Sequence, residues 1–547
     1  MSCNRRAVRA CCMATWRATL RRGRVPSADG RDRSASLHQH RSVAAAGRFG
    51  NFEQPFSRTS RAVNYRIARW IVAALVAIGS LVTVAGVARP GLLLAAELWV
   101  GGATVSITPD RPVALEGQFH TRIARKVEAP VTATALAIES RDGDKSLEQA
   151  VMISCDLVSI PEAVLAEVRR LVRERLPELD PAKIFISATH THTAPVVNDG
   201  KYKIVEEGVM EVNDYVDFLT QRLSQTVVKA WHSRRPGKVG WGLGYAVVGW
   251  NRRAVYADGR AVMYGGTDLP DFRALEAGVD PGVEVMFFTD KQEKLLALVV
   301  NVACPSQEVE NRSAIHADFW HPVRENLRRR YGQDLLVLAW TGASGDISPH
   351  WMYRKQAEQR MLRLRGSDTL EELARRISLA VEDAYEVARK ESFSEPTFSH
   401  RVLMLQLPLR PVTEEELAQA KAQVEALAND PSQYRRMLWH QSVVERHERQ
   451  KTQNAEKVEV HVLRLGDVAI ATNPFELFVD FGIQIKARSK ALQTFVVQLT
   501  GPGGYLATAK AVAGGGYSAV IESTLISPEG GQMLVDRTVE AINQLFP

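Results

Sequence analysis

The sequence predicts an α/β protein, with a mixed sheet core containing βαβ units, flanking helices and a single main catalytic domain. One observation behind this prediction is a strand, helix and strand pattern at 150–154, 161–176 and 183–187, an order typical of a parallel βαβ unit. The other is that two further apolar runs of strand length, 295–302 and 335–340, end in polar clusters, as the first two strands do.

Each element of the βαβ unit has its own signal. Residues 150–154 and 183–187 are short apolar runs typical of buried strands. Between them, apolar residues recur at helical spacing over 161–176, and Pro161 suits the first turn of a helix. Ligands of open α/β sheets bind beyond the carboxyl ends of the strands. We therefore expect the functional site where these strands end.

The rest of the chain favours one catalytic unit. The segments 413–427 and 433–450 have the pattern of charged surface helices, and 528–545 has that of a closing amphipathic helix. With 547 residues and 45% hydrophobic composition, the chain is long enough to bury a large core. We assign the catalytic domain to residues 97–547.

The net charge of +7 is concentrated at the amino end of the sequence. Residues 1–96 contain sixteen Arg and three acidic residues and so carry +13, whereas the rest of the chain carries −6. Phosphate attraction needs a clustered basic face on a folded domain. The mildly acidic catalytic part therefore argues against nucleic acid as a partner.

The first 96 residues predict export. Residues 1–62 have no sustained apolar period and are interpreted as a disordered basic leader, with an alternative true start near Val63. The segment 63–96 contains an uncharged run at 70–88 with Arg before it, a pattern that fits a signal peptide or a membrane anchor. Both interpretations place the catalytic domain outside the cytoplasm, as a periplasmic, extracellular or membrane-anchored protein.

Cysteine usage indicates no disulfide framework. Of the five cysteines, only Cys155 and Cys304 lie beyond the leader. The pair could form one bridge, remain two buried thiols, or contribute a metal ligand.

Two motifs at strand ends carry candidate chemistry. In the first, His190 and His192 directly follow the strand at 183–187. Alternate residues of an extended chain point to opposite faces, so one imidazole would bind a metal while the other contacts substrate or moves protons. The alternative is a hydrogen-bonded structural pair.

The second motif, residues 342–350, follows the strand at 335–340. Its glycines permit a tight turn that presents Ser348 at the sheet edge, although an ordinary Gly/Asp/Ser turn has the same composition.

Together these motifs resemble those of the neutral/alkaline ceramidase family. The matching segments follow the family's order along the chain and are residues 189–195, 345–349, 474–477 and 505–508. The resemblance extends from about residue 101 to the end of the sequence and implies a zinc-dependent amide hydrolase.

The resemblance also implies roles for individual residues. It makes Ser348 the nucleophile and His192 a neighbouring substrate-binding or proton-handling group. Arg252, in an Asn-Arg pair, would face the substrate, and Tyr517 would be a second active-site tyrosine. The implied zinc ligands are His190, Glu476 and Tyr505.

The sequence departs from the family at Cys304, where the ceramidases place another zinc histidine. A thiolate would keep a zinc ligand at this position. The alternatives are that the site is empty or that it is completed by His316, Asp318 or His321.

The predicted function is cleavage of an N-acyl compound, including lipids such as ceramide, by an extracytoplasmic zinc enzyme. A metal-dependent esterase or lactonase would use the same groups. A catalytically degenerate, membrane-tethered binding protein is the other alternative, and the change at Cys304 motivates it. The N-terminal apolar segment suggests membrane association in either case.

Overall fold

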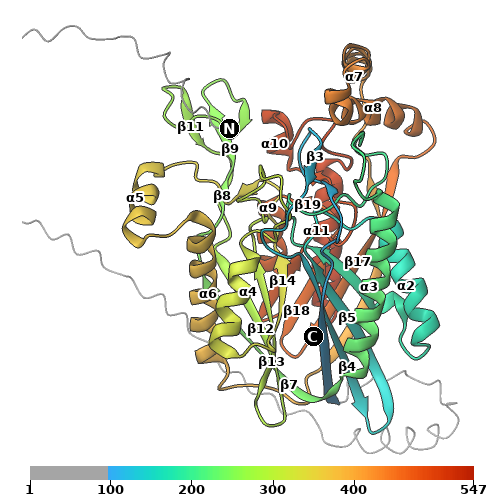
Figure 1. Ribbon diagram of the computed structural model, residues 1–547, viewed down its shortest axis with the longest axis vertical. Helices are drawn as coiled ribbons and strands as arrows, with labels where there is room; N and C mark the ends of the chain where they lie inside the picture. Colours follow the sequence, from blue (N-terminus) through green and yellow to red (C-terminus); the bar gives the residue numbers. More distant parts are fainter. Residues whose placement is uncertain (1–95, 547) are drawn as a thin grey trace, which may run out of the picture. The chain divides into compact units, whose positions relative to one another are not determined.

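The computed structural model describes residues 96–546 and confirms the predicted α/β class. Its centre is an eight-stranded mixed sheet (Figure 1), in the order β14-β13-β12-β7-β1-β4-β5-β6. The strands are β1 (Glu97–Ser106), β4 (Thr132–Asp142), β5 (Lys145–Cys155), β6 (Ile184–Ala188), β7 (Arg235–Tyr245), β12 (Gly282–Asp290), β13 (Leu295–Val302) and β14 (Leu336–Thr341).

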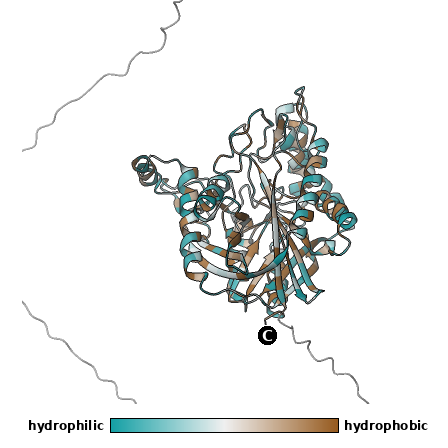
Figure 2. Ribbon diagram, turned by 60° about the horizontal axis from the view of Figure 1, so that its bottom comes forward, coloured by the Kyte–Doolittle hydropathy of each residue, from teal (hydrophilic) through white to brown (hydrophobic). Residues whose placement is uncertain are grey.

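A second sheet of four strands packs against the first. Its order is β16-β17-β18-β20, and its strands are β16 (Phe398–Pro408), β17 (Ala455–Leu465), β18 (Val468–Thr472) and β20 (Gln493–Val497). The buried layer between the two sheets takes side chains from both, including Trp340 of β14 and Phe495 of β20, whose ring centroids are 6.2 Å apart. Figure 2 shows the hydrophobic residues gathered on the strands.

Three parallel strand pairs are joined through helices. These pairs are β5 with β6, β13 with β14, and β18 with β20. Their connecting helices are α2 (Glu162–Arg175), α4 (Trp320–Tyr331) and α9 (Val479–Arg488). The first unit confirms the predicted strand–helix–strand pattern, and the second contains both further strands expected from the sequence.

Helices cover the outer face of each sheet. Alternate residues of a strand face opposite sides, and on β4 Ala135 and Ala137 face the helices while Leu136 and Ile138 face the inner layer. Helices α2 and α3 (Val212–His232) cover one half of the large sheet, and α4 and α6 (Thr369–Ala388) cover the other half. Helices α9 and α11 (Pro528–Asn543) cover the small sheet.

Shorter elements surround the ends of the strands. Four small sheets are formed by β2 (Val113–Leu115) with β3 (Arg122–Ala124), β8 (Trp250–Asn251) with β15 (Ile347–Ser348), β19 (Glu476–Leu477) with β21 (Tyr505–Leu506), and β9 (Arg253–Tyr256) with β10 (Ala261–Met263) and β11 (Phe272–Leu275). The remaining helices are α5 (Lys355–Arg365), α7 (Glu414–Leu427), α8 (Tyr434–Arg449) and α10 (Ala509–Gly514), with 3₁₀ turns at Pro181–Lys183 and Pro431–Gln433. The expected surface helices are α7 and α8, and the expected closing helix is α11.

The carboxyl ends of strands from both sheets meet at one place. The Thr341 hydroxyl at the end of β14 donates to the Ala188 carbonyl at the end of β6, at 3.4 Å. The backbone N–H of Gln498, just past β20, donates to the Thr341 carbonyl at 3.0 Å, and that of Gly342 donates to the Val302 carbonyl at 2.8 Å. The loops after β6, β13, β14 and β20 are therefore brought together, and the sequence predicted the first three of these strand ends.

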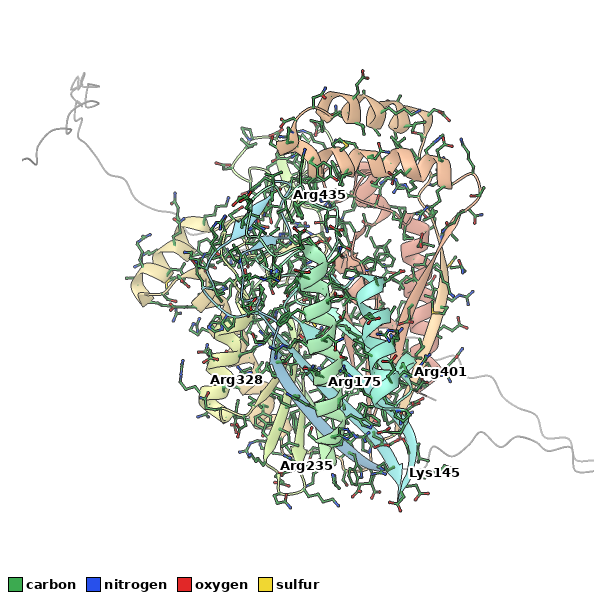
Figure 3. The ribbon with its side chains drawn as sticks, turned by 45° about the vertical axis from the view of Figure 1, so that its right-hand side comes forward. Lys145, Arg175, Arg235, Arg328, Arg401 and Arg435 are labelled. Carbon is green, nitrogen blue, oxygen red and sulfur yellow. The ribbon has the colours of Figure 1, made fainter. Side chains whose placement is uncertain are left out.

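The basic residues of the described part are spread over many elements. Those labelled in Figure 3 lie on strands and helices far apart on the surface, such as Arg175 on α2, Arg328 on α4 and Arg401 on β16. Nearly all of the predicted leader and export segment, residues 1–95, lies outside the described residues. Within 96–546, no helix is long and apolar enough to cross a membrane.

Gly345 is a position where the fold admits no side chain. A Cβ there would overlap the backbone carbonyl oxygen of Glu476, which cannot move without disturbing β19. We expect Gly345→Ala to lower the free energy of unfolding by about 1–3 kcal/mol, the usual cost of overpacking. Urea unfolding followed by fluorescence measures this change.

The matched control is Gly278→Ala, because a Cβ at Gly278 meets no atom within 4 Å. Equal stability of the two variants would show that the loop at Gly345 adjusts without cost.

Candidate active site

His190 follows β6 in a left-handed backbone conformation, with φ of 67°. A non-glycine residue rarely adopts this conformation, and such strain is concentrated at functional sites. The Nδ1 atom lies 2.7 Å from the Val158 carbonyl oxygen, which can only accept, so Nδ1 carries the proton. The other ring nitrogen, Nε2, faces the Glu476 carboxylate at 3.3 Å.

The His190 Nε2 atom and the Glu476 carboxylate both offer lone pairs, so their contact is favourable only with a proton or a metal ion between them. Burial opposes a charge on His190, but the nearby Glu476 carboxylate outweighs it and raises the pKa of the imidazole. Burial likewise works against ionisation of Glu476, yet His190 holds the pKa of that carboxyl below its usual value. The pair is therefore built to share a proton or a metal ion.

His192 lies beside this pair. Its Nε2 is 3.2 Å from His190 Nε2 and accepts a hydrogen bond from the Gln307 amide at 2.9 Å. Its Nδ1 is 3.2 Å from a carboxylate oxygen of Glu310. Burial lowers the pKa of His192, so its ring is neutral and able to take up a proton.

Glu476 and Tyr505 are placed side by side by pairing of β19 with β21. Burial raises the pKa of the Tyr505 phenol well above its ordinary value, and the Glu476 charge adds to this effect. The Tyr505 oxygen accepts a hydrogen bond from Arg252 Nη2 at 3.0 Å. An imidazole, a carboxylate and a phenol thus come together in a buried site.

Arg252 connects this group to the loop that contains Ser348. Its Nη2 also donates to the Gly345 carbonyl at 2.8 Å, and its backbone N–H donates to the Asp346 carbonyl at 2.9 Å. Its Nη1 is 3.4 Å from the Gln307 side-chain oxygen. One buried guanidinium therefore ties together loops that are far apart in the sequence.

Ser348 is held on β15, opposite Trp250 of β8. Its Oγ accepts hydrogen bonds from the Tyr264 hydroxyl at 3.0 Å and from the His350 backbone N–H at 3.1 Å. Two donors stabilise negative charge that develops on this oxygen. Tyr264 also has a left-handed backbone, with φ of 56°.

An aromatic group borders the site. Tyr517 packs against Tyr505 with ring centroids 5.7 Å apart, and Phe119 and Trp439 each pack against Tyr517 at 5.8 Å. This group offers an apolar and aromatic surface next to the polar cluster.

Cys304 is turned away from this cluster. Its thiol donates to the Val248 carbonyl at 3.4 Å, and the side chain belongs to an apolar core that includes Phe319 and Trp320. Burial raises the pKa of the thiol well above its ordinary value. Cys155 is buried as well, and both cysteines are free thiols.

The alternative cluster after Cys304 has structural contacts. The Asp318 carboxylate accepts backbone N–H groups of Val309 and Phe319 at 2.9 and 2.8 Å. The ring centroids of His316 and His321 are 6.3 Å apart.

Across residues 96–546, no three His, Cys, Asp or Glu side chains form a metal-binding group. A metal here would need His190, Glu476 and the Tyr505 oxygen, and the 3.3 Å contact between His190 Nε2 and the Glu476 carboxylate offers two of these donors.

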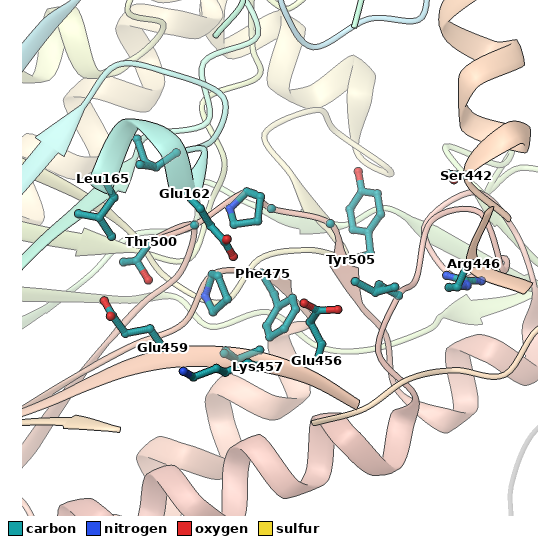
Figure 4. Close-up of a pocket in the computed structure, with 18 of the residues that line it drawn as sticks. Glu162, Leu165, Ser442, Arg446, Glu456, Lys457, Glu459, Phe475, Thr500 and Tyr505 are labelled. Carbon is teal, nitrogen blue, oxygen red and sulfur yellow. The ribbon is translucent and has the colours of Figure 1, made fainter. Parts of the chain in front are cut away.

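A cavity of about 800 Å³ is lined by residues 500–505, which lead to Tyr505. Figure 4 shows Phe475 and Tyr505 in its lining with the charged side chains of Arg446 and Glu459. Ser348 does not line it.

Three site residues were not identified from the sequence: Gln307, Glu310 and Tyr264. None lies in a recognisable motif, and a glutamine or tyrosine alone carries no signal. For Gln307 and Glu310 the only signal was their position. They follow the strand that ends at Val302, and the functional site was expected at the ends of such strands.

The described fold is similar to that of solved neutral ceramidases. It matches the neutral ceramidase from Pseudomonas aeruginosa with a TM-score of 0.58 and 16% sequence identity, over 82% of this chain and 75% of that chain. A ceramidase complexed with C2 matches with a TM-score of 0.58 and 15% identity, over 82% and 76% of the two chains. No protein-family model and no curated protein sequence matches. The protein thus has the fold that its motif resemblance implied.

Glu308, at the edge of the site, gives a test of its electrostatics. Burial, together with the nearby Asp318 carboxylate, raises the pKa of Glu308 from its ordinary value of 4.5 to about 8. A carboxyl group whose pKa is raised by folding does not lower stability at pH values below its pKa in the unfolded protein. It lowers stability increasingly as the pH rises from that pKa to its pKa in the folded protein. This group therefore destabilises the protein progressively between pH 4.5 and 8.

We expect Glu308→Gln to match wild type in urea unfolding near pH 4.5 and to be more stable at pH 9, by on the order of 4 kcal/mol. The exposed Glu425→Gln is the control and should show no such trend. Parallel stability curves for wild type and Glu308→Gln across this range would contradict the assignment.

Proposed function

We propose that this protein is a divergent member of the neutral ceramidase family that hydrolyses an N-acyl, lipid-like amide with the aid of zinc. The observation that supports this most directly is the contact between His190 and Glu476, with Tyr505 and Arg252 adjoining, at the strand ends of a ceramidase-like fold. Ser348 lies on β15, which pairs with β8, and Arg252 directly follows β8. These residues come from separate parts of the sequence.

Zinc would be held by His190, Glu476 and Tyr505, and its chemistry would be to polarise a carbonyl oxygen or acidify a bound hydroxyl group. The hydrogen bond from His190 Nδ1 to the Val158 carbonyl fixes the tautomer that a zinc-binding Nε2 requires.

The chain's own residues would carry out acyl transfer. Ser348 Oγ attacks the amide carbonyl carbon, forming an acyl–serine ester while the C–N bond breaks and the amine leaves with the hydroxyl proton. Water then hydrolyses the ester and restores the serine. Tyr264 supports charge on Oγ, Arg252 and Tyr517 orient the substrate, and His192 takes up or returns a proton.

The aromatic group of Phe119, Trp439 and Tyr517 supports an apolar substrate portion beside the polar cluster. One of the similar structures is described as a ceramidase complexed with C2. An N-acyl lipid of the ceramide class is therefore the proposed substrate, and the apolar run at 70–88 supports action outside the cytoplasm.

A second candidate function is a binding protein without catalysis, and the burial of Cys304 favours it. If the thiol stays in the apolar core, the chain offers one zinc ligand fewer than the ceramidases. Zinc content and turnover of the purified protein separate the two candidates.

The function is tested with a panel of N-acyl amides and matched esters. We expect wild type to release the fatty acid from an amide, and Ser348→Ala to reduce kcat by about 10³-fold or more while its zinc content is unchanged, because a nucleophile is not a ligand. Zinc is measured by mass spectrometry. His190→Ala is the contrasting variant and should lose the metal, and turnover by Ser348→Ala at the wild-type rate would refute the serine assignment.

Substitutions of Cys304 decide whether it is a ligand. Since the thiol lies in the apolar core, we expect Cys304→Ser to keep wild-type zinc and to lower stability by about 1–3 kcal/mol through burial of a hydroxyl group. Cys304→His should destabilise the protein more, because the core has no room for an imidazole. Zinc retained by the His variant and lost by the Ser variant would instead make Cys304 a ligand.

A further inference from the structure

Helix α5 stands apart from the rest of the described fold (Figure 1), seven residues after Ser348. It contains 11 residues, and none of them is buried. Its few ties to the fold include the ion pair between Glu358 and Arg376 of α6, at 2.8 Å. Burial against the protein therefore does not explain why this segment is helical and apolar in part.

The exposed side of α5 has an apolar stripe. Ala357, Met361 and Leu364 are spaced by four and three residues and so lie on one face of the helix. Met361 is 41% exposed and Leu364 is 64% exposed. Glu358 and Leu362, which are half-buried, lie roughly 120° around the helix from this stripe, on the side that faces the protein.

The same segment is strongly basic. Residues 354–365 contain one acidic residue, Glu358, and five basic residues, which are Arg354, Lys355, Arg360, Arg363 and Arg365. At 100° per residue, Arg360 and Arg365 flank the apolar stripe on its two sides, and Arg365 also pairs with Glu372 of α6, its Nε 3.5 Å from a carboxylate oxygen. Within residues 96–546, neither Arg360 nor Arg363 forms an ion pair. This local charge of +4 contrasts with −6 for residues 97–547.

We propose that α5 docks on an anionic lipid surface, with Met361 and Leu364 inserted among the lipids and with Arg360 and Arg363 on the phosphate groups. A short helix with a basic polar face and an exposed apolar stripe is the pattern of interfacial helices that lie in the membrane plane. A nucleic acid would use the arginines but leave the apolar stripe in water. An acidic lipid surface uses both features.

The location of α5 gives this docking a consequence. The Thr267 hydroxyl donates to the Met352 carbonyl at 2.7 Å, which joins the loop after β10 to the segment that leads into α5. Leu269 in that loop is 47% exposed, and Tyr353 before the helix is 43% exposed. Tyr264, which donates to Ser348, is 38% exposed on the same joined segments. Docking would bring the Ser348 side of the site to the lipid surface.

The test is hydrogen–deuterium exchange of the full chain in buffer, with phosphatidylcholine vesicles, and with vesicles that also contain phosphatidylglycerol. We expect the amides of 355–365 to exchange at least about tenfold more slowly on the anionic vesicles only, because each basic residue near such a surface gains about fivefold in binding. Helix α7, which is acidic and of which only Leu417 and Ala420 are buried, is the internal control. The readout is local, so it is independent of the segment at 63–96 and of amide hydrolysis.

Two variants with matched controls sharpen the test. Arg360→Glu with Arg363→Glu should weaken vesicle binding by roughly thirtyfold or more and so remove the protection of α5, while Arg173→Glu with Lys421→Glu, the same charge change on other helices, should not. Leu364→Ser should also weaken it, unlike Leu379→Ser on α6, where Leu379 is 49% exposed.

Unchanged exchange on anionic vesicles would overturn the proposal. Equal protection on neutral vesicles would also overturn it, because charge would then play no part. Protection without vesicles that rises with protein concentration would assign α5 to contact with a second copy, and concentration-independent protection would assign it to another segment of the chain.

Discussion

The apolar layer between the two sheets is the constraint on which the rest of the structure depends. Large side chains such as Phe185, Trp340 and Phe495 fill it, and close packing leaves little freedom in how one sheet lies on the other. The relative position of the sheets determines where the ends of β6, β14 and β20 meet. The site is formed at that place, so its geometry is fixed by side chains that take no part in its chemistry.

Within the site, buried charge is arranged so that no group stands alone. The Glu476 carboxylate faces His190, and the Arg252 guanidinium is surrounded by the Tyr505 oxygen and the Gly345 carbonyl. Removing charged groups from water is costly unless they are paired and hydrogen-bonded. This mutual dependence explains why segments distant in sequence are held together, and why the lone pairs of His190 and Glu476 provide a place for a cation.

The protein has a ceramidase-like fold, with Cys304 where the motif resemblance implies a histidine. Cys304 follows β13 at the expected place, but its thiol bonds to the Val248 carbonyl and packs in the apolar core. Gln307, three residues later, instead contacts both His192 and Arg252. The side chain that reaches the polar cluster from the segment after β13 is therefore the Gln307 amide.

The sequence by itself determined the strands β5, β6, β13 and β14, the helix α2 and the polar strand ends, because period and turn chemistry are local properties. It also determined the order of the motifs that include His190 and Ser348. Only the tertiary structure decided that the antiparallel strands β1, β4, β7 and β12 complete the large sheet, since pairing depends on distant partners. It also decided the roles open to Tyr264 and Cys304, because the direction of a side chain is set by what packs around it.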